Sequence, residues 1–148
     1  MRVLGLDIEE KLIGIAVSDA LGIVAQRCGF IENRSKIYVV EKIKEIIAEK
    51  DIVQVVIGVP LNLNGSIGRR GGIALEFKKV LEEAISLPVD TWDERFSDKS
   101  IGRVLAQKGD ARRRKRKEKI EKVAAQWMLQ GYLDKNRNEI EEYYYEEG

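Results

Sequence analysis

The chain has 148 residues, of which 44% are hydrophobic and 34% are charged, a composition typical of one folded domain. It carries 26 basic and 25 acidic side chains, one cysteine and no histidine. Histidine-based triads, histidine general bases and zinc sites of the usual kind are therefore excluded, and any catalysis must use carboxylates, hydroxyls, amines or a hard metal ion.

The first third of the chain predicts three strands. An apolar run over residues 3–8 ends in acids, a polar turn follows, and a second apolar run covers residues 12–17, so the two runs predict a hairpin. A third, more mixed strand is expected over residues 23–31, at an edge of the sheet. From Ser35, a suitable N-cap, the apolar spacing becomes helical.

The middle of the chain alternates between strand and helix patterns. The β-branched run over residues 52–60 predicts a central strand that is covered on both faces. A glycine-rich loop is expected over residues 62–72, followed by an amphipathic helix through residue 84. A short strand over residues 88–92 then runs into Asp93-Glu94-Arg95.

The last third predicts helices. Ser97 can cap a helix that Gly109 would end, and a wholly basic run follows over residues 112–117. The final helix carries apolar or small residues at helical spacing, namely Ile120, Val123, Ala124, Trp127, Met128 and Gly131.

Three strands followed by alternating helices and strands is the element order of the ribonuclease H-like fold. We therefore expect an α/β fold with a five-stranded mixed sheet, flanked by helices on both faces, and with the first strand central. The expected domain spans residues 1–134, and an acidic, tyrosine-rich tail occupies residues 135–148.

Four sequence segments make the pattern more specific, and together they span residues 4–134. With them, the chain resembles the YqgF-type family, also called Holliday junction resolvases and assigned to maturation of the 5′ end of pre-16S ribosomal RNA. The segments are Leu4-Gly5-Leu6-Asp7 with Ile13-Gly14-Ile15-Ala16-Val17-Ser18-Asp19; Ile57-Gly58-Val59-Pro60-Leu61-Asn62 with Asn64-Gly65-Ser66; Trp92-Asp93-Glu94-Arg95; and residues 119–134 with the pair Ala124-Ala125. Two positions depart from the family pattern: Glu9 replaces the usual glycine, and Glu121 replaces the usual aspartate.

The resemblance implies a nuclease in which acids from distant chain positions converge on Mg²⁺ or Mn²⁺. Asp7, Glu94 and Glu121 are the expected catalytic and metal-holding residues. Two Mg²⁺ ions ~3.5–4 Å apart can activate a water and stabilise the leaving oxygen of a phosphodiester. Asp7 and Glu94 would share one sheet edge if their strands are parallel neighbours. Asp93 and Glu9 are neighbouring acids that could substitute for them.

Several cations are candidates for contact with nucleic acid. The run Arg112, Arg113, Arg114, Lys115, Arg116 and Lys117 is either a solvated connection or a set of phosphate contacts. The glycine-rich loop is either a surface loop or a substrate loop, with Arg69 and Arg70 on phosphate and Asn62 supporting the site. Arg95 is a further candidate. The two tryptophans, Trp92 and Trp127, are expected in the core rather than in base stacking.

Three functions remain open from the sequence. The first is a metal-dependent endonuclease on structured nucleic acid, either pre-rRNA or branched DNA. The second is a non-catalytic RNA- or ribosome-binding factor, which Glu9 and Glu121 favour. The third, an actin-like or sugar-kinase-like ATPase, is disfavoured because the chain is short and Glu9 stands where a phosphate-binding glycine is needed.

The sequence also bears on compartment and assembly. Cys28 cannot form an intramolecular disulfide, which indicates a reducing compartment. The N-terminus is not typical of a signal peptide, and no apolar run approaches the ~20 residues of a membrane span. We therefore expect a cytoplasmic protein without a membrane partner, as a monomer or weak homodimer.

Overall fold

The computed structural model describes residues 1–95 and 123–137. Its centre is a five-stranded sheet in the order β3-β2-β1-β4-β5, so the first strand is central, as predicted. β1 pairs antiparallel with β2 and parallel with β4, which pairs parallel with β5. The strands are β1 (Arg2–Ile8), β2 (Leu12–Ser18), β3 (Ala25–Glu32), β4 (Ile52–Val59) and β5 (Val89–Asp93).

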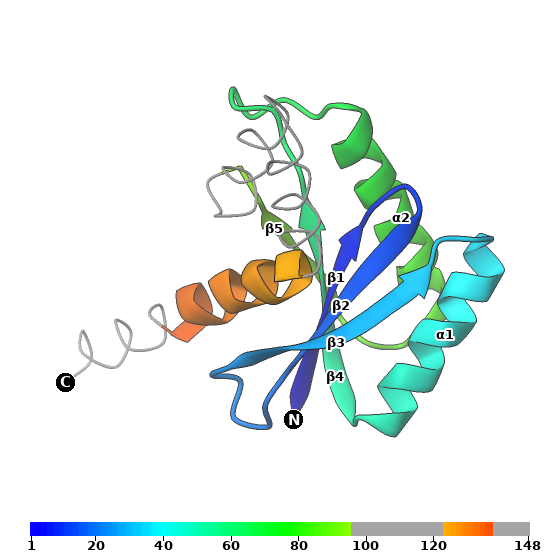
Figure 1. Ribbon diagram of the computed structural model, residues 1–148, viewed down its shortest axis with the longest axis vertical. Coiled ribbons are helices and arrows are strands. Elements are labelled where there is room, and N and C mark those ends of the chain that lie inside the picture. Colours follow the sequence, from blue (N-terminus) through cyan, green and yellow to red (C-terminus); the bar gives the residue numbers. More distant parts are fainter. Residues whose placement is uncertain (96–122, 138–148) are drawn as a thin grey trace, which may run out of the picture.

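Helices pack on both faces of the sheet (Figure 1). The helices α1 (Lys36–Glu49) and α2 (Arg69–Ala84) cover one face, and a C-terminal helix over residues 123–137 crosses the other. The C-terminal helix extends past residue 134, where the sequence places the domain boundary. No helix within these described ranges is long and apolar enough to cross a membrane.

Alternation along the strands divides the core between the two faces. On β1, the side chains of Leu4, Leu6 and Ile8 join the core under α1 and α2. On the other face, β1 contributes Gly5, which lies against the C-terminal helix, and Asp7, which lies near it. The second core is built from Ala16, Ala25, Val56, Ala125, Met128, Leu129, Tyr132 and Leu133.

Most element boundaries follow the predicted signals. Ser35 caps α1, because its Oγ accepts a hydrogen bond from the backbone nitrogen of Tyr38 at 3.1 Å. The predicted glycine-rich loop is wrong at its end: it closes at Gly68, and α2 begins at Arg69. Gly71, in this first turn, allows a close approach to the preceding loop, because a β-carbon there would come 2.9 Å from the carbonyl oxygen of Pro60.

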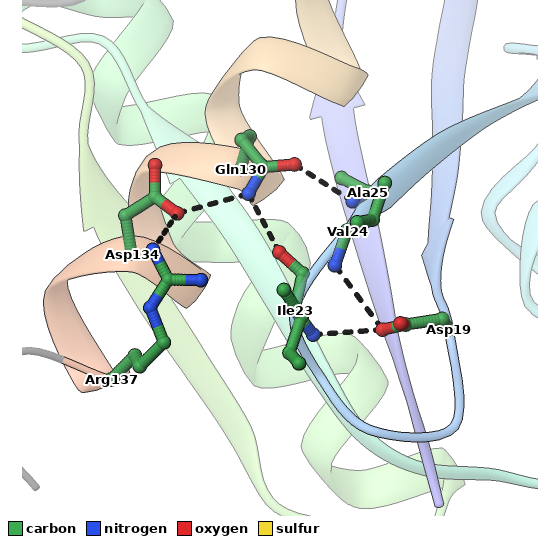
Figure 2. Close-up of polar contacts among 7 residues, drawn as sticks. All are labelled: Asp19, Ile23, Val24, Ala25, Gln130, Asp134 and Arg137. Atoms are coloured by element: carbon green, nitrogen blue, oxygen red, sulfur yellow. Dashed lines mark hydrogen bonds and ion pairs between the residues drawn. The ribbon is translucent and has the colours of Figure 1, made fainter.

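The turn from β2 into β3 is fixed by polar contacts, which Figure 2 shows. Asp19 accepts hydrogen bonds from the backbone nitrogens of Ile23 at 2.7 Å and Val24 at 3.2 Å. These bonds lower the pKa of the Asp19 carboxyl. Residues 23 and 24 therefore belong to the turn, and β3 begins at Ala25, two residues later than predicted.

The C-terminal helix is attached to that turn by a glutamine (Figure 2). Gln130 accepts from the backbone nitrogen of Ala25 at 2.8 Å and donates to the carbonyl oxygen of Ile23, also at 2.8 Å. Gln126 donates to the carbonyl oxygen of Ala25 at 3.1 Å. Two side chains of the helix thus satisfy backbone groups at the start of an edge strand.

Candidate active site

Asp7 is a buried acid near the end of the central strand. Its side chain is 3% exposed and lies on the face of the C-terminal helix. Asp7 pairs with Gly14 of β2, and a β-carbon at Gly14 would lie 3.6 Å from Cβ of Asp7 and 3.3 Å from Cβ of Ala125. The glycine therefore leaves the space into which both Asp7 and the helix fit.

Glu94 directly follows β5 and is 1% exposed. Its backbone nitrogen donates to the carbonyl oxygen of Val59 at 3.2 Å, which extends the pairing of β5 with β4 by one residue. The carboxyl group lies over Gly58, where a β-carbon would come 2.8 Å from Cδ of Glu94. The same β-carbon would meet Cγ of Met128, so Glu94 is on the face of the C-terminal helix.

Asp7 and Glu94 therefore come together across β4. Leu6 pairs with Ile57, which places Asp7 beside Gly58, and the Glu94 carboxyl sits over Gly58. One strand spacing of about 5 Å separates the backbone of Asp7 from that of Gly58, and two spacings, about 10 Å, separate the backbones of Asp7 and Glu94. The strands β1 and β5 are parallel, as expected, but they are not neighbours, because β4 lies between them.

The third predicted acid lies outside the described residues. Within residues 1–95 and 123–137, no group of three or more acids or cysteines could hold a metal ion. Glu121 precedes Ala125 by four positions in the sequence. The basic run from Arg112 to Lys117 is likewise outside the described ranges.

Arg95 is paired with the acid two residues before it. Its Nε and Nη2 donate to Oδ2 of Asp93, both at 2.8 Å. Burial alone raises the pKa of Asp93, but the hydrogen bonds and charge of Arg95 outweigh burial and lower it. The guanidinium also lies against Gly65, where a β-carbon would be 3.0 Å from Nη1. Arg95 thus connects the end of β5 to the loop after β4.

Arg70 holds a second ion pair at the same end of the sheet. Its Nη2 lies 2.6 Å from Oε2 of Glu9, in the turn between β1 and β2. The Arg70 side chain is 47% exposed, so much of it still faces solvent. Glu9, one of the two departures from the family pattern, therefore joins the start of α2 to the turn after Asp7.

The loop between β4 and α2 is organised from within by Asn62. Its Nδ2 donates to Oγ of Ser66 at 2.9 Å, and its backbone nitrogen donates to the carbonyl oxygen of Ser66 at 3.0 Å. Gly65 donates to the carbonyl oxygen of Asn62 at 2.8 Å. Asn62 shapes the loop against which Arg95 lies, while Arg69 opens α2 with an exposed side chain.

The two tryptophans differ from each other. Trp92 is partly buried against the second core and meets Tyr132 edge to face, with ring centroids 6.2 Å apart. Trp127 is 37% exposed, so its predicted core position is wrong. The buried stripe of the helix runs through positions 124, 125, 128, 129, 132 and 133, which leaves Trp127 at its margin.

The two glycines that make room for the acids were not identified from the sequence. Gly58 makes room for the Glu94 carboxyl, and Gly14 makes room beside Asp7. The signal was present, because both glycines interrupt otherwise β-branched or apolar strands. An isolated glycine within a strand often marks close approach of another group.

Comparison with known proteins identifies the family of the chain. The chain matches the family model described as "RuvX: Holliday junction resolvase" over residues 1–135. A relative in Thermoanaerobacter pseudethanolicus, named "Putative pre-16S rRNA nuclease", is 43% identical over 138 residues, which are 93% of this chain and 99% of that one. A relative of the same name in Clostridium botulinum (strain Eklund 17B / Type B) is 43% identical over 135 residues, which are 91% and 98% of the two chains.

Solved structures show the same fold. The Thermus thermophilus RuvC structure matches with a TM-score of 0.52 and 13% identity, over 93% of this chain and 97% of that one. RuvC of the same organism in complex with a Holliday junction substrate matches with a TM-score of 0.50 and 12% identity, over 93% and 96%. The fold is therefore ribonuclease H-like, as predicted. With the match over residues 1–135 and relatives at 43% identity, the chain belongs to the RuvX family of nucleases.

Proposed function

We propose that the chain is a Mg²⁺- or Mn²⁺-dependent endonuclease that processes the 5′ end of pre-16S ribosomal RNA. The observation that carries the proposal is the meeting of Asp7 and Glu94, two buried acids from distant chain positions, across Gly58. Isolated burial of carboxylates is costly, and their convergence at one sheet end is typical of a site with a chemical task.

The donor set suits a hard divalent cation. Carboxylate oxygens are the ligands that Mg²⁺ prefers, and Mg²⁺ needs only a few of them because it keeps several waters. Asp7 and Glu94 would hold the ion, and Glu121, four positions before Ala125 in the sequence, is the third acid that the family resemblance implies. When bound, the metal supplies activation of water and neutralisation of phosphate charge.

The protein's own residues position the substrate around this pair. The ion pairs of Arg95 with Asp93 and Arg70 with Glu9 fix the loops on either side of the acids. Arg69, Arg70 and Arg95 then present positive charge toward a polyanion. The run from Arg112 to Lys117 adds phosphate contacts, which give affinity without sequence preference.

A ribosomal RNA precursor is the proposed substrate because the relatives at 43% identity are named for it. A second candidate, a branched DNA junction, is favoured by the description of the matching family. We further place the protein in the cytoplasm, as a monomer or weak homodimer.

The test compares cleavage of a pre-16S 5′ fragment and a four-way DNA junction, each with Mg²⁺ and with Mn²⁺. Metal-dependent cleavage of the RNA that exceeds cleavage of the junction supports the proposal. Preference for the junction would assign the chain to DNA recombination. Tight RNA binding without cleavage under any condition would instead show a binding factor.

A further inference from the structure

We propose that Phe30 is a positioning residue that stacks on an unpaired nucleobase next to the bond that is cut. The inference rests on the nuclease function proposed above. Phe30 lies in the same row of the sheet as Asp7, because Asp7 pairs with Gly14 and Gly14 pairs with Phe30. Gly14, the residue between Asp7 and Phe30 in this row, has no side chain.

The ring of Phe30 and the acid share the space over Gly14. A β-carbon at Gly14 would lie 3.6 Å from Cβ of Asp7 and 3.8 Å from Cε1 of Phe30. Both side chains are therefore on the face of the C-terminal helix. Two strand spacings, about 10 Å, separate the two backbones, a distance that a nucleotide flanking the cleaved phosphate can span.

The Phe30 side chain is 42% exposed, although it sits on the face that packs the second core. It belongs to neither core cluster among the described residues. Single exposed apolar side chains are ordinary on protein surfaces, so exposure alone indicates nothing. What distinguishes Phe30 is that its ring shares the space over Gly14 with the side chain of Asp7, a buried acid.

A β-bulge aims Phe30 at this position. Ala16 pairs with Arg27 and Gly14 pairs with Phe30, so one residue of β2 faces two residues of β3. Gly29, within the bulge, has φ +93°, which glycine adopts without strain. Without the extra residue, strand alternation would turn Phe30 to the α1 and α2 face and turn Ile31 out of its core. Bulges commonly re-aim side chains beside active sites.

The chemistry of the ring limits what it can recognise. Phenylalanine has no hydrogen-bonding group, so it cannot select one base by its polar edge. Stacking accepts every base, because each has a π-face, but it requires the base to be free of its own stack. The geometry therefore points to a substrate with an unpaired nucleotide beside the cut, in preference to a continuous duplex.

The test measures binding of an RNA that carries 2-aminopurine at the flanking unpaired position. Binding is measured in the cleavage-deficient Asp7→Asn background, and cleavage kinetics are measured with Asp7 intact. Phe30→Ala should weaken binding roughly 5- to 150-fold and raise KM more than it lowers kcat. The bound 2-aminopurine should fluoresce more strongly, because the stacking partner is gone. The salt dependence of binding should stay unchanged, because no phosphate contact is lost.

Three further variants separate stacking from general packing. Phe30→Trp should restore binding and quenching, whereas Phe30→Leu, which keeps apolar bulk without a ring, should behave as Phe30→Ala does. Ile37→Ala removes an even more exposed apolar side chain from α1, on the opposite face of the sheet, and should bind as the parent does. A folded Phe30→Ala or Phe30→Leu protein with parental affinity and quenching would overturn the inference while leaving the nuclease function standing. A parent protein that neither binds nor cleaves any nucleic acid would overturn both this inference and the proposed nuclease function.

Discussion

The carboxyl group of Glu94 occupies the space that a side chain at Gly58 would need. A β-carbon there would lie 2.8 Å from Cδ of Glu94 and 2.9 Å from Cγ of Met128. Gly58→Ala must therefore displace the acid, the helix or both. We expect a loss of stability of about 1–3 kcal/mol and a fall in cleavage rate, measured by chemical denaturation and by initial rates.

The same substitution elsewhere provides the matched control. Gly72, within α2, has no heavy atom within 4 Å of where its β-carbon would be. Gly72→Ala should therefore stabilise the protein, by about 0.5–1 kcal/mol, through the higher helix propensity of alanine. If Gly58→Ala retains full stability and activity, the placement of Glu94 over Gly58 is not needed for function.

Asp7→Asn tests the acid at the centre of the sheet. The substitution keeps the shape of the side chain and removes its charge, so it should abolish metal-dependent cleavage while leaving folding intact. Binding of nucleic acid without metal should survive or improve, because a negative charge that faces phosphate is gone. Thermal unfolding, binding and cleavage are measured on the same preparation. Full activity in folded Asp7→Asn would refute the proposed mechanism.

Glu121→Asp tests the third acid. The substitution restores the residue usual in the family and shortens the side chain by one methylene. If Glu121 holds the metal with Asp7 and Glu94, Glu121→Asp should keep or raise cleavage, whereas Glu121→Gln should remove most of it. Equal cleavage by wild type and Glu121→Gln would exclude this position from the site.

The basic run is tested by replacing Arg113, Arg114 and Arg116 with Glu. Binding should weaken, and the slope of log affinity against log salt should become shallower by up to ~0.9 per lost contact on duplex DNA. Affinity is measured by fluorescence anisotropy over a salt series. An unchanged slope in a folded triple variant would identify the run as a solvated connection.

Tyr132 gives the protein a sensitivity to high pH. Its Oη accepts from Nε2 of Gln54 at 2.7 Å and donates to Oδ2 of Asp90 at 3.0 Å. Burial, together with the charge of Asp90, raises the pKa of Tyr132 above its ordinary value of 10.0. The folded state favours the neutral phenol. The stability that Tyr132 contributes to the folded state is therefore complete below pH 10.0, and it is lost as the pH rises through the higher pKa that Tyr132 has in the folded state.

Tyr132→Phe should flatten this alkaline loss of stability. At neutral pH the variant should be less stable by about 1–3 kcal/mol, because Gln54 and Asp90 lose a partner in a partly buried place. Denaturant unfolding from neutral pH to above pH 10 measures both effects. Parallel pH profiles for the two proteins would show that folding does not shift the pKa of Tyr132.

The fold could be predicted because its signals are local and periodic. The strand run before residue 60 and the change to helical spacing after Ser35 determined the element order, and with it the central position of β1. Asp7 and Glu94 could be proposed because the family resemblance implies acids at these positions, one near the end of β1 and one directly after β5. Their meeting across Gly58 could not be predicted, because it depends on β4 lying between their strands and on the space left by a missing side chain.

Other details depend on packing rather than pattern. Arg69 and Arg70 lie within glycine-rich sequence, which favours a loop, yet α2 begins at Arg69, and Gly71 in its first turn approaches Pro60 closely. Trp127 fits the helical apolar spacing of its neighbours, but the helix turns a stripe of Ala, Met and Leu toward the sheet and leaves the tryptophan at the margin. The spacing of apolar residues predicts that a segment is helical, but it predicts only roughly which face of the helix turns toward the sheet.

The attachment of the C-terminal helix has a consequence for how the protein is made. During synthesis the sheet emerges first, and α1 and α2 can cover one of its faces while Gly5, Asp7 and Gly14 still lie bare on the other. Among the residues that the structure describes, that second face is covered by the helix over residues 123–137, more than a hundred residues later than Asp7. A chain that has not yet been synthesised past this helix therefore lacks the element that packs beside its buried acids, and a nuclease assembled in this order becomes competent only after residues 123–137 have been made.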